Sequence, residues 1–135
     1  MVQSDTSPLT LIHEPLYLRG IELYRTGRFF ECHEVLEELW TPIEGPRRLY
    51  LQSLIHFAVA FYHQQRRNPV GAERQLRKAL RKLEAYLPQF EGVDTATLCR
   101  EGRISLERMQ AGEPAAPPRM LLQDFLDSGF GHGRE

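Results

Sequence analysis

Apolar side chains recur at three- and four-residue steps along most of the chain, which is the spacing of a buried helical face. The first such stretch begins at Pro15, a favoured first helical residue, and ends before Gly27, a favoured C-terminal cap. The second runs from about Arg28 to Trp40, acidic on one side and apolar on the other. Thr41-Pro42 ends it, because the residue before a proline avoids the α region.

The rest of the pattern predicts three further helices. Leu49 to Tyr62 is apolar nearly all round, so we expect it at the centre of a bundle. Asn68-Pro69 supplies an N-cap and a first-turn proline for a fourth helix that Pro88 ends. Asp94 caps a fifth helix that reaches about Gln110. The fold class expected is therefore all-α: a compact bundle of about five helices, with two antiparallel helical hairpins plus a C-terminal helix.

The 135 residues fit one domain with tails. Residues 1–14 have little periodicity and are expected to form a flexible N-terminal arm, and residues 15–111 form the helical domain. Residues 112–135 begin as a Pro-rich linker and continue as a C-terminal tail. In that tail, Met120 to Leu126 is an apolar cluster that predicts one short helix docking on the core or on another chain. A homo-oligomer or a protein partner is thus expected to bind through the tail.

The charge balance gives no global field, because 17 basic and 18 acidic residues leave a net charge of −1. Neither nucleic acid nor a membrane is therefore expected as a partner. No segment approaches the roughly 20 apolar residues of a membrane span, and the N-terminus lacks the pattern of a signal peptide. Cys32 and Cys99 lie far apart and indicate reduced thiols, so we expect a cytoplasmic location.

One strip of the second helix carries the best candidate chemistry. His33, Glu37 and Trp40 project from it together, since positions four and seven apart differ by only about 20–40° around a helix. Phe30 flanks the strip, so the histidine and the carboxylate should be partly buried, with Trp40 and Phe30 as pocket walls. The order of the pair, histidine before acid, is the less favourable one for simple helix stabilisation.

A second polar strip lies on the most apolar helix, where Gln52, His56 and His63 fall within about 40° of one another. If the two strips face each other, their side chains form a polar cluster in an apolar core. Imidazoles and a carboxylate that converge on one ion would bind a divalent metal such as zinc, manganese or iron. A histidine held by a carboxylate would instead supply acid–base chemistry, and a hydrogen-bonded network would only satisfy buried polar atoms.

Several sharper signatures are absent from the sequence. His33-Glu34-x-x-Glu37 opens like a zinc-protease helix but lacks its second histidine, and no Glu-x-x-His pair indicates a di-iron bundle. There is no glycine-rich phosphate loop and no serine nucleophile elbow. The basic face of the fourth helix is interpreted as solvated, because acidic residues interrupt it and no aromatic side chain is placed to stack on bases.

The run from Gly27 to Trp40 resembles the bacterial and archaeal domain-of-unknown-function family 309, whose signature is H-x-x-x-E-x-x-W/Y. Further matches extend the resemblance over about residues 18–95; they lie at Leu51–His56, Ala60–His63, Asn68, Gly71-Ala72 and Ala79-Leu80. The resemblance implies a compact helical fold and a signature suspected of metal binding, with no established activity. His33, Glu37 and Trp40 match the signature itself, while Gln52 and His63 follow from the companion matches.

Two functions stay open. The first is a metal-binding or acid–base site of His33 and Glu37, supported by His63, Gln52 and His56; whether the protein is an enzyme is left undecided. The second is a non-catalytic protein-interaction module. It is favoured by the alignment of the second and fourth helices at an offset of about 40 residues, which gives two hairpins that look like tetratricopeptide units.

Overall fold

The computed structural model describes residues 10–122. This part of the chain forms five α-helices and two short 3-10 turns, at Leu11–His13 and Glu84–Tyr86. The α-helices are α1 (Pro15–Arg25), α2 (Phe29–Trp40), α3 (Pro46–Gln65), α4 (Pro69–Leu83) and α5 (Thr95–Gln110). No β-strand occurs between residues 10 and 122, so the predicted all-α fold is confirmed.

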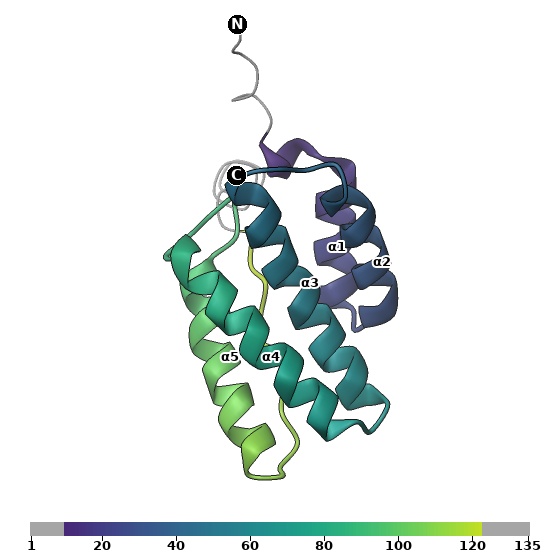
Figure 1. Cartoon of the computed structure of the whole chain (residues 1–135), viewed down its shortest axis with the longest axis vertical. Helices are drawn as coiled ribbons and strands as arrows, with labels where there is room; N and C mark the ends of the chain where they lie inside the picture. The colour runs from purple at the N-terminus through teal and green to yellow at the C-terminus, as the bar shows by residue number, and fades with distance from the viewer. Residues whose placement is uncertain (1–9, 123–135) are drawn as a thin grey trace, which may run out of the picture.

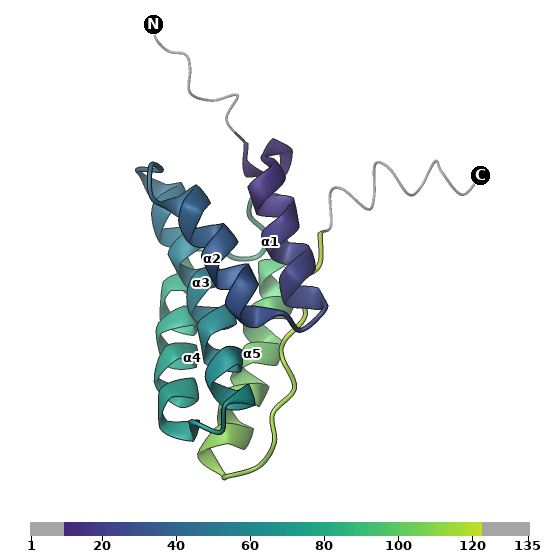
Figure 2. The same cartoon turned by 90° about the vertical axis from the view of Figure 1, so that its right-hand side faces the viewer.

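The helices form two layers. In Figure 1, α3 lies between α2 and α4, and the three share the front of the molecule. Figure 2, a side view, shows that α1, α5 and the extended segment after α5 lie behind this layer. Helices α1 and α2 make one hairpin, α3 and α4 make the second, and α5 packs on α4. This is the predicted arrangement of two hairpins plus a C-terminal helix.

Three helix ends carry the caps that the sequence predicts. The Asn68 side chain accepts a hydrogen bond from the backbone N–H of Gly71 at 3.0 Å and so caps α4. Asp94 caps α5 in the same way, through the backbone N–H of Thr97 at 3.0 Å. Gly27 follows α1 with a φ of 81°, a left-handed conformation that favours glycine.

Helix α4 ends at Leu83, earlier than the predicted end at Pro88. The chain continues as the 3-10 turn Glu84–Tyr86, which turns the Tyr86 ring inward so that its hydroxyl donates to the Pro46 carbonyl at 2.8 Å. Leu87, the residue before Pro88, is extended, so Pro88 limits the 3-10 turn that follows α4.

The core is centred on α3, as its apolar composition predicts. Tyr50, Leu54, Phe57 and Phe61 of this helix are fully buried. Gly20 lets α1 approach α2 closely, because a Cβ atom there would lie 2.5 Å from Cδ2 of Leu36. The core thus holds the two layers together and fixes the positions of α2 and α3.

The segment expected to be a linker packs against the domain over its described part. Met120 is fully buried, the Tyr24 hydroxyl donates to the Pro118 carbonyl at 2.7 Å, and the backbone N–H of Asp94 donates to the Leu121 carbonyl at 2.9 Å. Residues 120–122 are extended, whereas a short helix was expected from Met120 to Leu126. Phe125 and Leu126 lie outside the described residues, so contact of the tail with another chain stays a prediction.

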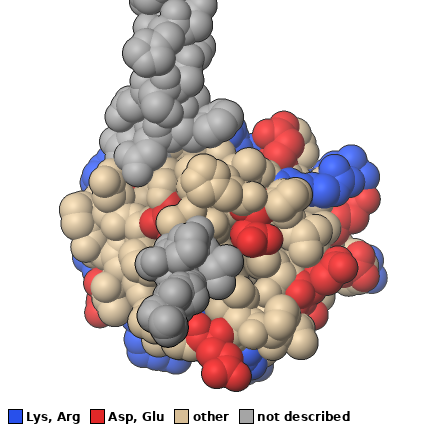
Figure 3. Space-filling model, turned by 90° about the horizontal axis from the view of Figure 1, so that it is seen from above, with Lys and Arg blue, Asp and Glu red and all other residues tan. Residues whose placement is uncertain are grey.

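No helix within residues 10–122 is long and apolar enough to cross a membrane. Cys32 and Cys99 are both buried and free. The end of the molecule at which α1 begins is seen in Figure 3, where acidic side chains lie among uncharged surface and basic side chains lie mostly at the edge.

Candidate functional site

His33 of α2 and His63 of α3 line one small cleft between these helices. Phe30, Val59 and Tyr62 complete its walls, and its volume is about 130 Å³. The ring centroid of Phe30 lies 5.3 Å from that of Tyr62 and 5.7 Å from that of His33. The cleft therefore has aromatic walls and two imidazoles from different helices.

The side chains of His33 and Glu37 pair along the outer edge of α2. Nε2 of His33 lies 3.4 Å from a carboxylate oxygen of Glu37. The histidine side chain is 26 % exposed, which agrees with the expected partial burial, but the carboxylate is 52 % exposed. A carboxylate at Nε2 favours the tautomer with hydrogen on that nitrogen, which leaves Nδ1 as an acceptor.

His56 has separate partners on α4. Its Nδ1 lies 2.7 Å from Oε1 of Gln75, and its Nε2 lies 2.9 Å from Nζ of Lys82. An ammonium can only donate, so Nε2 accepts from Lys82 and Nδ1–H donates to Gln75. The ring is neutral in this arrangement. Burial, and then the positive charges of Lys82 and its neighbours, lower the pKa of His56.

The two polar strips thus lie side by side on the outer face of the α2–α3–α4 layer, because α2 and α3 are neighbours in one layer. They do not face each other across the core. His63 reaches the cleft and also lies near the α3–α4 turn, where its Nδ1 is 3.4 Å from Nδ2 of Asn68. Gln52 is partly buried one turn before His56, without a side-chain hydrogen bond to any described residue. The structure therefore brings together His33, Glu37 and His63, but not His56 or Gln52.

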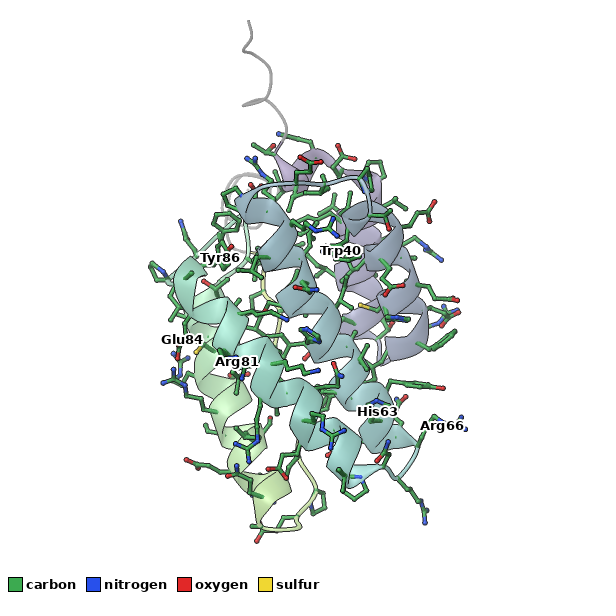
Figure 4. All side chains as sticks on the ribbon, in the orientation of Figure 1. Trp40, His63, Arg66, Arg81, Glu84 and Tyr86 are labelled. Carbon is green, nitrogen blue, oxygen red and sulfur yellow. The ribbon has the colours of Figure 1, made fainter. Side chains whose placement is uncertain are left out.

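Trp40 lies away from the cleft, at the C-terminal end of α2. The guanidinium carbon of Arg48 lies 3.8 Å from the centroid of its ring, and Nη1 of Arg48 donates to the carbonyl of Ile43 at 3.0 Å. Figure 4 shows the labelled Trp40 and His63 well apart on the molecule. Trp40 therefore holds the α2–α3 connection, whereas Phe30 lines the cleft.

The described residues do not form a metal site by themselves. Among residues 10–122, no group of three or more His, Cys, Asp or Glu side chains is placed to hold a metal ion. The cleft offers two imidazoles, and the nearby carboxylate is paired with one of them. Zinc sites in proteins normally use three or four protein ligands, so this geometry does not fit such a site.

One buried carboxylate, that of Glu91, was not predicted from the sequence, which only indicates a turn at this position. Its side chain is 7 % exposed, accepts from the backbone N–H of Leu11 at 2.7 Å and pairs with Nε of Arg47 at 2.5 Å. Its carbonyl accepts from the Tyr17 hydroxyl at 2.8 Å. These bonds join the chain before α1, α3 and the α4–α5 connection. Glu91 thus has a structural role.

Fold and site together define a small all-α domain with a cleft that two histidines line on one helical layer, where Glu37 pairs with His33. Residues 17–75 match the sequence model of the family described as Domain of unknown function (DUF309), and they include the whole cleft. The resemblance predicted from the His33-x-x-x-Glu37-x-x-Trp40 signature is therefore confirmed over residues 17–75.

A relative is also found among curated proteins. The chain is 43 % identical over 96 residues to the uncharacterized protein YpuF of Bacillus subtilis (strain 168), which covers 67 % of this chain and 50 % of that protein. The chain thus spans about half the length of the curated relative it matches. Neither name carries an activity, so function must be inferred from the cleft.

Proposed function

We propose that the α2–α3 cleft binds one ring-sized group and that His33 exchanges a proton with it. The observation that carries this proposal is the sharing of one aromatic-walled cleft by His33 and His63. The two imidazoles come from different helices, and a core that is fully buried behind α3 holds them in place. We also infer a cytoplasmic location, which the two buried free cysteines support.

The size of the cleft selects the group. An apolar cavity of about 150 Å³ is large enough to hold benzene. The cleft, at about 130 Å³, therefore suits a single six-membered ring or a branched side chain. Phe30 and Tyr62 offer faces and edges for offset or edge-to-face contact with an aromatic ring.

The histidines indicate which substituent the bound ring should carry. With Glu37 at Nε2, Nδ1 of His33 accepts a hydrogen bond, which suits a hydroxyl on the bound ring. A histidine oriented by a carboxylate is also the usual arrangement of a general base. Glu37 acts here as a positioning residue. The preferred occupant is therefore phenol-like: one aromatic ring that carries a proton donor.

The test uses p-cresol as the probe and toluene as the matched probe without a hydroxyl. We expect p-cresol to shift the NMR signals of the His33, Phe30 and Tyr62 rings in a saturable way. One hydrogen bond contributes about 1 kcal/mol, so toluene should bind about fivefold more weakly. His33→Ala should abolish the preference for p-cresol, and Glu37→Gln should reduce it. His13→Ala, a change at an exposed histidine outside the cleft, is the control.

Two results would contradict the proposal. Equal binding of p-cresol and toluene, unchanged in Glu37→Gln, would mean an apolar hollow without acid–base function. If neither probe binds to the native protein or to any variant, and the helical circular dichroism of all of them is intact, the cleft is not a binding site.

A second function, self-association through the same face, is favoured by two exposed apolar side chains. Phe30 of α2 is 46 % exposed and Leu49 of α3 is 42 % exposed. Acidic residues such as Glu34 lie on α2, and basic residues such as Lys78 lie on α4. A two-fold axis parallel to α3, in front of the outer face of this layer, would place the acidic helix of one copy against the basic helix of the other.

Molecular mass measured over a range of concentrations distinguishes the two functions. Self-association predicts a dimer that Glu34→Lys or Lys78→Glu weakens and that a mixture of the two variants restores. A monomer at all concentrations would leave the cleft as the better account.

A further inference from the structure

A second hollow lies at the end of the molecule where the chain enters α1 and leaves α2. Because α1 and α2 are antiparallel, the start of one lies beside the end of the other, and residues 41–45 close a third side. The groove has a volume of about 510 Å³, within the usual range of binding pockets. Its apolar lining comes from Leu11, Leu16, Leu39, Pro42 and Ile43.

The charged side chains that line this groove are mostly acidic. They are Glu14, Glu38 and Glu44, against a single basic residue, Arg47. Arg47 is already paired with the buried carboxylate of Glu91 at 2.5 Å. None of the three lining glutamates forms an ion pair with another residue between 10 and 122. The groove therefore combines an aliphatic floor with uncompensated negative charge, at the end of the molecule seen in Figure 3.

Helix stability does not account for all of this charge. Glu14 and Glu44 lie at or just before the N-terminal ends of α1 and α3, where a carboxylate interacts favourably with the helix dipole. Glu38 lies in the last turn of α2, where the dipole makes a carboxylate unfavourable. The Glu38 carboxylate therefore lowers the stability of α2, and a cationic ligand in the groove would offset this effect.

We propose that this groove binds a basic amphipathic helix of a partner protein. Aliphatic side chains at helical spacing on the partner fill the floor, and flanking Lys or Arg residues pair with Glu14, Glu38 and Glu44. A free ammonium ligand is less well matched, because none of the residues between 10 and 122 that line the groove is aromatic and could form a cage around it. Charge complementarity also distinguishes this occupant from a second copy of the acidic groove.

The probe is a fluorescent 14-residue peptide with Leu at helical spacing and Lys at the other positions. A peptide of the same composition without that spacing, and one with Glu in place of Lys, are the matched probes. Binding to the full chain is measured by fluorescence anisotropy. We expect the amphipathic basic peptide to bind at least tenfold more tightly than either matched peptide, with an affinity that falls as salt rises.

Variants distinguish binding in the groove from attraction to the overall charge of the protein. Glu38→Lys should weaken binding at least tenfold. Glu107→Lys makes the same change of charge on an exposed residue of α5, away from the groove, and should change binding less than twofold. Ile43→Ser, in the loop at the floor, should also weaken binding several-fold. Thermal unfolding followed by circular dichroism verifies that each variant is folded.

Three outcomes would overturn the proposal. The first is equal weakening by Glu38→Lys and Glu107→Lys, which indicates attraction to the overall charge only. The second is full binding by folded Ile43→Ser, which removes the apolar floor from recognition. The third is equal affinity for the amphipathic peptide and its unpatterned counterpart.

Discussion

Replacing His56 by glutamine should remove a pH-dependent part of the free energy of unfolding. In the folded protein, Nε2 of the neutral ring accepts from Lys82 Nζ at 2.9 Å, and Nδ1 donates to Gln75 at 2.7 Å. A proton added at Nε2 would break the bond from Lys82 and place an imidazolium against an ammonium. The folded protein therefore resists protonation of this ring.

The sign and size of the effect follow from linkage. Burial, followed by the charges of Lys82, Lys78 and Arg81, lowers the folded-state pKa of His56, while a Gln75 hydrogen bond opposes this. The unfolded chain has the ordinary histidine pKa of about 6.5. Stability is therefore complete above about pH 6.5 and is lost as the pH falls toward the folded-state pKa. Within that window the free energy of unfolding falls by at most about 1.4 kcal/mol per pH unit, the slope for one proton.

Urea denaturation between pH 8 and pH 5 measures the effect. The difference between the native chain and His56→Gln should be flat above pH 7 and should change below it, because all other titrating groups cancel. His13→Gln, at an exposed histidine, should leave the profile of the native chain unchanged. Parallel profiles for the native chain and His56→Gln would refute the assigned tautomer and its bond to Lys82.

Three further substitutions test the framework that positions the cleft, each by urea denaturation at pH 7. Glu91→Ala removes the acceptor for Leu11 and Arg47 and should cost about 2–3 kcal/mol, since hydrogen bonds to charged groups contribute about 1.5 kcal/mol or more each; Glu91→Gln should cost less. Asn68→Ala should cost about 1 kcal/mol through loss of the α4 cap, and Asn68→Ser should retain most of it. Gly20→Ile should cost about 1–3 kcal/mol by overpacking α1 against α2, and an unchanged midpoint would contradict the close approach described for these helices.

The helices and their order could be predicted because the local signals agree with one another. Prolines at first-turn positions, Asn68 and Asp94 as caps, and Gly27 as a terminator all act within a few residues of the sequence. The apolar circumference of α3 likewise predicts its central place. Such features depend on backbone preferences and on helical period, which a single sequence contains.

The site could be predicted only in part. A helical wheel shows on which side of a helix a side chain projects, but it does not show which other helix packs against that side. His33 and His63 do meet, but the two polar strips lie side by side on one layer. The His56 ring contacts α4, where Lys82 donates a hydrogen bond to its Nε2. The sequence pattern instead indicated that the basic face of this helix is solvated. Trp40 is drawn to Arg48, which follows it after a loop whose path the sequence pattern does not fix.

Longer-range packing explains the remaining differences. The segment after Gly112 has the composition of a linker, yet carbonyls at Pro118 and Leu121 accept hydrogen bonds from Tyr24 and Asp94. Glu91 joins Leu11 and Arg47 across more than 40 residues of sequence. Partners so distant in the chain leave no periodic signal.

Intermolecular nuclear Overhauser effects between p-cresol and the protein test the central claim most directly. The account predicts contacts from the p-cresol ring to Phe30, Val59 and Tyr62, with its hydroxyl end nearest His33, and their loss in His33→Ala. Contacts elsewhere on the molecule, or none at saturating p-cresol, would contradict the assignment of the α2–α3 cleft as the functional site.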